Sequence, residues 1–268
     1  MKENRSDWWN KLDKNRGSRP RAVLFMEGSK TEIASKLSDM VGIPTVQVSK
    51  SHKWMPTGIP KKAKDDVWDI SPAKELRLDQ PNDLVSPEIQ SILQQWWLAE
   101  PRNANSPNWD IASTCTIDGK PGILLVEAKA HKNELHSGGK THPSSLNGWK
   151  NHFQIGRVTS EACAELQFNT GKKWAITRDS HYQMSNRFAW SWKLTSLGIP
   201  VVLVYLGFLN ATDMQDDGPL FNTHDVWEKA VIQHGSTIIP KGIWGSEIDF
   251  DSIKLYPIIR SYYQPFDV

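Results

Sequence analysis

Three charged side chains lie in a segment that is otherwise mostly apolar. Asp110 precedes one apolar run, and Glu127 and Lys129 end the next. Glu127 and Lys129 are two residues apart, so on a strand they share one face. Two neighbouring carboxylates repel unless a proton or a cation lies between them, and Mg²⁺ or Mn²⁺ takes such oxygen ligands. With an amine beside it, this kind of ion polarises a phosphodiester and activates water, so these residue types indicate metal-assisted hydrolysis.

A β-hairpin would bring the three charges together. Segments 109–117 and 122–130 are apolar-rich, and 118–122 (Asp-Gly-Lys-Pro-Gly) has the composition of a hairpin turn. If Asp118 is opposite Pro121, then Asp110 is opposite Lys129, on the face that also carries Glu127. A register that slips by one residue would turn Asp110 to the other face.

These residues also carry a resemblance. Pro107-Asn108-Trp109-Asp110, followed by Glu127-Ala128-Lys129 on the next strand, resembles the PD-(D/E)xK nuclease superfamily, which has the restriction-endonuclease-like fold. Two residues separate the Pro from the Asp, a departure that leaves the acidic position in place. The resemblance extends over about residues 86–210. It implies an α/β protein with a mixed central sheet flanked by helices, acting on DNA.

The resemblance also implies roles for the site residues. Asp110 and Glu127 would bind Mg²⁺ or Mn²⁺, with the Ala128 carbonyl as a further oxygen ligand. Lys129 would orient the attacking water or help to deprotonate it. A helix before the hairpin often supplies an extra carboxylate in this superfamily, and Glu88 holds a matching place. A first-turn acid that the helix dipole favours is the alternative explanation for Glu88.

Four residues are candidates for contacts with nucleic acid. Gln183 and Arg187 are four apart on a predicted helix. They are similar to the helix-borne Gln motif of RecB-like and phage exonuclease members, although Arg187 stands where that motif has Tyr. A surface hydrogen-bonding pair is the alternative. His131 and Lys132 open a segment rich in Lys, His, Gly and Ser, whose composition suits phosphate contacts.

Other functions stay open at this point. The three charges could form an ordinary cluster on the surface of a hairpin. The chain could be a catalytically inactive nucleic-acid-binding module on the same fold, an enzyme with another substrate, or a Toprim-like protein centred on Glu27. Salt-sensitive binding without cleavage would distinguish the binding module.

Composition sets limits on the class of protein. The chain has 268 residues, 38% of them hydrophobic and 23% charged, with a net charge of +2. No apolar run approaches the ~20 residues of a membrane span, so no membrane partner is expected. The polar N-terminus lacks the apolar core of a signal peptide, and Cys115 and Cys163 give no disulfide framework. We therefore expect a cytoplasmic protein. Whether it forms a homodimer is left open by the sequence.

Two regions are predicted from the patterns along the chain. Residues 1–80 form an N-terminal α/β extension and basic linker, with a strand at 22–26, a helix that Ser29 and Glu32 cap, and a strand at 44–48. Residues 81–268 form the nuclease domain. Its further elements are helices at 86–100, 154–168, 181–197 and 223–234 and strands at 201–209 and 253–263.

Overall fold

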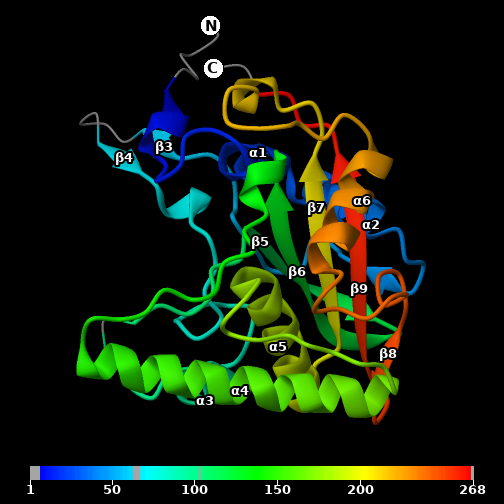
Figure 1. The fold of residues 1–268 in the computed structure, drawn as a ribbon. Coiled ribbons are helices and arrows are strands. Elements are labelled where there is room, and N and C mark those ends of the chain that lie inside the picture. Colours follow the sequence, from blue (N-terminus) through cyan, green and yellow to red (C-terminus); the bar gives the residue numbers. More distant parts are fainter. Residues whose placement is uncertain (1–6, 63–66, 103, 267–268) are drawn as a thin grey trace, which may run out of the picture.

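A mixed β-sheet lies at the centre of the computed structural model, which describes residues 7–62, 67–102 and 104–266 (Figure 1). The strand order is β1-β5-β6-β7-β9-β8, and β2 also pairs with β5. β6, β7 and β9 are parallel, and the other pairs are antiparallel. The strands are β1 (Val46–Gln47), β2 (Trp54–Met55), β5 (Ile111–Ile117), β6 (Lys120–Lys129), β7 (Val201–Phe208), β8 (Ile248–Phe250) and β9 (Ile253–Tyr262). A separate small sheet pairs β3 (Lys61–Lys62) with β4 (Trp68–Asp69).

Helices cover both faces of this sheet. They are α1 (Ser18–Phe25), α2 (Lys30–Val41), α3 (Pro87–Trp97), α4 (Leu146–Thr170), α5 (Tyr182–Ser196) and α6 (His224–Gly235). Alternate residues of β6 enter different cores, because successive side chains of a strand point to opposite faces. Ile123 and Leu125 pack with residues of α3 to α6, whereas Leu124 and Val126 pack with α1 and α2. The mixed sheet flanked by helices confirms the expected α/β class.

Most elements expected after residue 80 are present. Ser86 caps α3 through the Ile89 N–H, with Pro87 in the first turn. All eight residues of β7 are buried, as its continuous apolar sequence predicts for a strand covered on both faces. α4 is longer than expected and begins at Leu146, where Ser145 accepts a hydrogen bond from the Gly148 N–H. Among the described residues, no helix is both long and apolar enough to cross a membrane.

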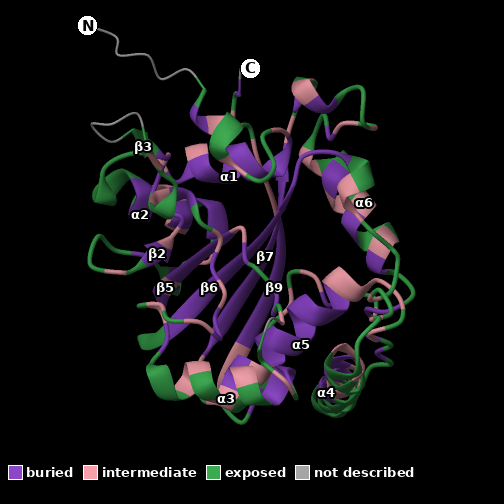
Figure 2. Ribbon diagram, turned by 90° about the vertical axis from the view of Figure 1, so that its left-hand side faces the viewer, coloured by how far each residue is buried: buried purple, intermediate pink, exposed green. Residues whose placement is uncertain are grey.

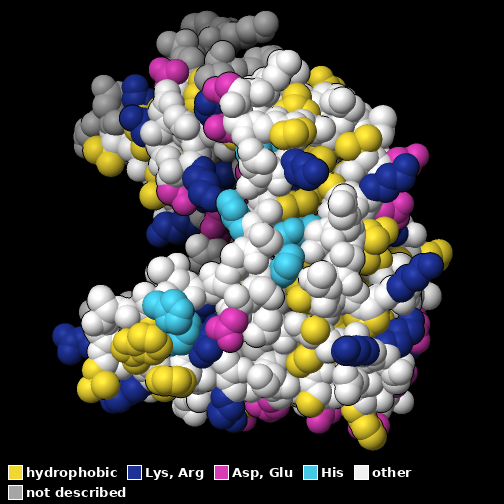
Figure 3. Space-filling view, in the orientation of Figure 1, with side chains coloured by type: hydrophobic (Ala, Val, Ile, Leu, Met, Phe, Trp, Pro, Cys, Tyr) yellow, Lys and Arg dark blue, Asp and Glu magenta, His cyan; other side chains and the backbone are white. Residues whose placement is uncertain are grey.

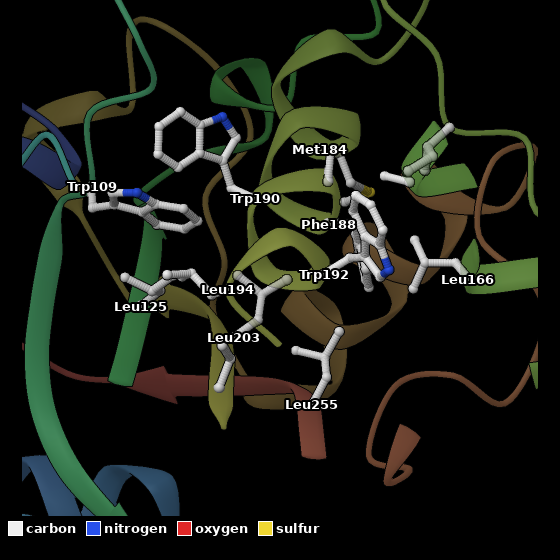
Figure 4. Close-up of a cluster of buried hydrophobic side chains, with 14 of the residues drawn as sticks. Trp109, Leu125, Leu166, Met184, Phe188, Trp190, Trp192, Leu194, Leu203 and Leu255 are labelled. Atoms are coloured by element: carbon white, nitrogen blue, oxygen red, sulfur yellow. The ribbon is translucent and has the colours of Figure 1, made fainter. Parts of the chain in front are cut away.

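Tryptophan fills much of the core between the sheet and α3 to α5. Trp97, Trp109 and Trp190 are fully buried. The rings of Trp97 and Trp190 meet nearly edge to face, with 5.6 Å between centroids. Figure 4 shows Trp190 and Trp192 on one helix, with Trp109 nearby and Leu125 and Leu203 from the sheet. Burial of these rings fixes α5 over the sheet, and α5 is the helix that supplies Arg187 and Gln183.

The N-terminal region differs from its prediction. The expected strand at 22–26 is wrong: these residues belong to α1 and its end, and nearly all of them are buried. A five-residue apolar run fits a buried helix as well as a strand, so its pattern could not decide. The capping box of Ser29 and Glu32 on α2 is confirmed. Instead of forming a separate unit, β1 and β2 extend the central sheet along β5.

Candidate active site

The turn of the hairpin sets the register of the site. Asp118 and Gly119 form a two-residue loop with φ of 49° and 77°, which places Ile117 opposite Lys120. The expected pairing of Asp118 with Pro121, and so of Asp110 with Lys129, is wrong by two residues. Two residues are one full side-chain period, so Asp110 keeps its face. Since Ile111 is opposite Val126, Asp110 occupies the position opposite Glu127.

Asp110, Glu127 and Lys129 line one cavity of about 430 Å³. Asp110 lies just before β5, and its Oδ2 accepts a hydrogen bond from the Ala128 N–H at 2.7 Å. Glu127 and Lys129 follow Ile123 and Leu125 on the β6 face that packs against α5. In the space-filling view the surface is hollowed on the left, with charged side chains along the upper wall of the hollow (Figure 3).

Glu127 is paired with two cations. Its Oε1 accepts from Lys129 Nζ at 2.5 Å, and its Oε2 accepts from Arg187 Nε at 2.6 Å. Arg187 also donates to the Asn108 carbonyl at 2.6 Å and lies over the Trp109 ring, 4.5 Å from its centroid. Arg187 is only 5% exposed. Its guanidinium is therefore committed to holding Glu127 and the chain before β5, and the expected contact of Arg187 with nucleic acid is replaced by this positioning role.

A third carboxylate reaches the site from a segment that the sequence did not single out. Leu76 and Trp109 form a β-bridge with hydrogen bonds in both directions, at 3.2 and 2.8 Å. Continued by one residue, this antiparallel register puts Glu75 opposite Asp110. Glu75, Asp110 and Glu127 thus follow one another across three neighbouring segments. The Nε of Arg19, in α1, lies 3.2 Å from the Oε1 of Glu75, and Arg19 lines the same cavity.

Glu88 does not join this group. It is exposed in the first turn of α3 and does not line the cavity, so the expected place of Glu88 in the metal site is not supported by the geometry. Glu75 was missed because residues 71–80 carry no strand pattern. Only the long-range bridge between Leu76 and Trp109 brings that carboxylate in.

The candidates for nucleic-acid contacts are placed differently from one another. Gln183 lines the cavity. His131 is 5% exposed and its backbone pairs with Leu220, so its side chain lies below the surface, and its phosphate contact stays a prediction. Lys132 is exposed but lies outside the cavity lining. His136 lines the cavity, although no pattern in the sequence distinguishes it from the other histidines of its segment.

The two central carboxyl groups differ in electrostatics. Burial, together with repulsion from Glu127 and Glu75, raises the pKa of Asp110 to about 8, against the weaker attraction of Lys129. Burial also opposes ionisation of Glu127, but Arg187 and Lys129 outweigh it and lower the pKa of Glu127. For Lys129, burial is outweighed by Glu127 and Asp110, and its pKa is raised. Glu127 and Lys129 are therefore charged, whereas Asp110, with a pKa of about 8, keeps its proton at neutral pH in the protein alone.

Comparisons of the chain with protein-family models, curated proteins and solved structures find no match.

The donor chemistry fits a hard cation. The surrounding protein disfavours the ionised form of Asp110, which a bound cation would favour, and the Oδ1 of Asp110 accepts no hydrogen bond from a described residue. The N–H and C=O of a strand residue point to the same edge, so the Ala128 carbonyl faces the edge where its N–H meets Asp110. Within the described ranges, no three His, Cys, Asp or Glu side chains are already close enough to hold a metal. Glu127 would have to exchange one of its cation contacts, and Glu75 would have to turn inward.

Proposed function

We propose that this protein is a Mg²⁺- or Mn²⁺-dependent nuclease that hydrolyses phosphodiester bonds in DNA, on a restriction-endonuclease-like fold. The single observation that carries the proposal is the position of Asp110, Glu127 and Lys129. They lie on one face, at one end of adjacent strands, around one cavity. The parallel pairing of β6 with β7 and the helices on both sides are the surroundings that such a site has in the resembled superfamily.

Each residue has a distinct role in this proposal. Asp110, Glu127 and the Ala128 carbonyl bind the cation, and Glu75 takes the place that the sequence suggested for Glu88. The bound cation supplies a Lewis acid for the phosphoryl oxygen. Lys129 stays protonated, orients the attacking water and offsets the charge that develops on the phosphate. Arg187 holds Glu127 in place without touching the substrate.

A second candidate is a nucleic-acid-binding module without turnover. It is favoured by the double pairing of Glu127, whose two oxygens already meet Lys129 and Arg187. A carboxylate that is paired with two cations in this way can stabilise the fold without binding a metal. This candidate predicts salt-sensitive DNA binding but no nicking with either cation.

The test is cleavage by purified protein of plasmid, linear, single-stranded and branched DNA, with and without Mn²⁺. We expect cleavage that needs the cation, and a loss of about 100-fold or more in Asp110→Ala and in Lys129→Ala, because each removes a group that acts on the transition state. Urea unfolding of both variants checks that they remain folded. Cleavage that persists in both folded variants refutes the proposed site, and wild type that binds DNA without cleaving it supports the second candidate.

Matched glutamate variants test the third carboxylate. Glu75→Gln should raise the Mn²⁺ concentration needed for half-maximal cleavage by about tenfold or more, the effect typical of residues that support a metal site. Glu88→Gln is the control and should leave that concentration unchanged. Equal effects of the two substitutions would remove Glu75 from the site.

A further inference from the structure

A second, larger cavity adjoins the candidate active site. Its volume is about 880 Å³, and Glu75 and Arg77 line both cavities, so the two meet at that point. The larger one, here called the edge groove, is lined by β2, which pairs with β5, and by segments before and after it in the chain. Figure 2 shows this part of the molecule, with α2 and β2 above and α3 below. Residues from the start of α2, from β2 and from 80–84 form its walls.

Three lysines from three separate segments converge on the edge groove. Lys30 begins α2, Lys53 precedes β2, and Lys74 precedes Glu75. All three are exposed, and none of their amines makes a salt bridge or hydrogen bond with a described residue. Surface lysines are usually scattered over solvated faces. Here they gather in one concavity that leads to the carboxylates, which favours a negatively charged ligand.

The charge of the other residues that line the groove also favours a negatively charged ligand. Lys30, Lys53, Lys74 and Arg77 are the Lys and Arg residues of the groove, and Glu75 and Asp83 are its only acids. The floor is apolar: Trp54 is 7% exposed and Leu76 is 6% exposed, and both line the groove. An apolar floor below a basic rim suits a nucleic-acid strand, whose bases turn inward while its phosphates meet the amines.

We propose that the edge groove binds an unpaired strand of nucleic acid on one side of the phosphodiester bond to be cleaved. This inference rests on the proposed function, because it extends the substrate of that same site. The size of the groove selects one strand over two. Its volume lies in the range of small-molecule pockets, about 300–1,000 Å³. A groove of that size takes a few nucleotides of a single strand, and a duplex is too wide to reach its floor.

The test is the salt dependence of binding by the full chain. Fluorescence anisotropy with a labelled single-stranded oligonucleotide and with its blunt duplex is measured in EDTA, so that no cleavage occurs. The variant Lys30→Gln/Lys53→Gln/Lys74→Gln should lose about 100-fold in single-strand affinity at 0.1 M salt. Its slope of log K against log salt should fall by about 2, since each phosphate contact on a single strand contributes about 0.7.

A matched control removes the same charge elsewhere. Lys173, Lys229 and Lys241 are exposed and line neither cavity, so their triple Gln variant should bind as wild type does. Equal losses in the two triple variants, an unchanged slope in the groove variant, or a larger loss for the duplex than for the single strand would each overturn the proposal. Binding in EDTA does not depend on hydrolysis. Failure of the groove is therefore distinguishable from failure of the catalytic site, which the Asp110→Ala cleavage assay reports.

Discussion

Two neighbouring carboxyl groups in this site have opposite surroundings. Glu127 meets Lys129 and Arg187 and is held ionised, whereas Asp110 is buried and faces Glu127 and Glu75, and the attraction of Lys129 and the hydrogen bond from the Ala128 N–H do not outweigh these effects. Environments that push two pKa values apart usually mark different tasks. Glu127 is fixed in position, and Asp110 is the group that gains most from a cation. Asp110 is therefore the carboxyl group whose ionisation a bound divalent ion would favour most.

The raised pKa of Asp110 should make the free energy of unfolding depend on pH. Asp110 has a folded-state pKa of about 8, above the 3.8 of an ordinary Asp, so the folded chain retains a proton that the unfolded chain loses. The stability of the wild type should then fall as pH rises between those two values. Asp110→Asn can still accept the Ala128 N–H but cannot ionise. We expect it to be more stable than wild type by about 1–3 kcal/mol at pH 8.5 and similar to it at pH 4.

Urea unfolding at the two pH values gives the measurement. Glu88→Gln is the control, since Glu88 lies on the surface away from the cavity. Added Mg²⁺ should narrow the difference at pH 8.5 by stabilising the wild type alone. If the difference in unfolding free energy between Asp110→Asn and the wild type is the same at both pH values, ionisation of Asp110 does not destabilise the folded protein.

The sequence identified some of these residues and could not identify others. Asp110, Glu127 and Lys129 share a hairpin, so a local pattern was sufficient to bring them together. Glu75 enters through a bridge between positions 33 residues apart, Leu76 and Trp109. The pairing of Arg187 with Glu127 spans 60 residues. Contacts of that kind depend on how distant segments pack, and no spacing along the chain encodes them.

The face of the sheet on which each hairpin side chain lies could be predicted from the sequence, whereas the pairing register of the two strands could not. The two-residue turn was predicted at 119–120 and lies at Asp118–Gly119, one residue earlier. This difference shifts the pairing by two residues and leaves every side chain on its expected face. α1 was mistaken for a strand because its apolar run is short and buried nearly all round. β7 was recognisable because eight consecutive apolar or small residues, after a helix that ends near Gly198, are typical of a strand covered on both faces.

The packing of β7 against α6 can be tested at Gly207. Gly207 is paired with Lys129, and a Cβ there would lie 2.5–2.7 Å from the Trp227 ring of α6. Gly207→Ala should therefore destabilise the protein by about 1–3 kcal/mol, because the ring or the strand must move. Gly138→Ala is the control: nothing lies within 4 Å of the added carbon, and the effect should stay within about 0.5 kcal/mol. Thermal unfolding of both variants decides, and equal melting temperatures would contradict the packing argument.

The whole molecule is less divisible than the sequence suggested. The predicted boundary near residue 80 followed a change in composition. Strands of two residues, such as β1 and β2, leave no pattern that could have argued against it. In the structure, α1 and α2 pack on one face of the central sheet, and Arg21 of α1 pairs with Asp213, far along the chain. Glu75, on the near side of that boundary, is part of the candidate site.

Removal of residues 1–80 should therefore unfold the remainder. In the intact chain, Leu124, Val126, Val202 and Val204 are fully buried beneath α1 and α2, and the fragment 81–268 would expose this face of the sheet to water. An exposed apolar face of that kind, with an unpaired edge on β5, favours aggregation or a loosely packed state. We expect the fragment to bind the dye ANS, to lose its near-UV circular dichroism and to unfold without a sharp transition, whereas the full chain unfolds cooperatively. A fragment that unfolds sharply and cleaves DNA as the full chain does would show instead that the first 80 residues are an appendage, and that the carboxylate of Glu75 is not needed.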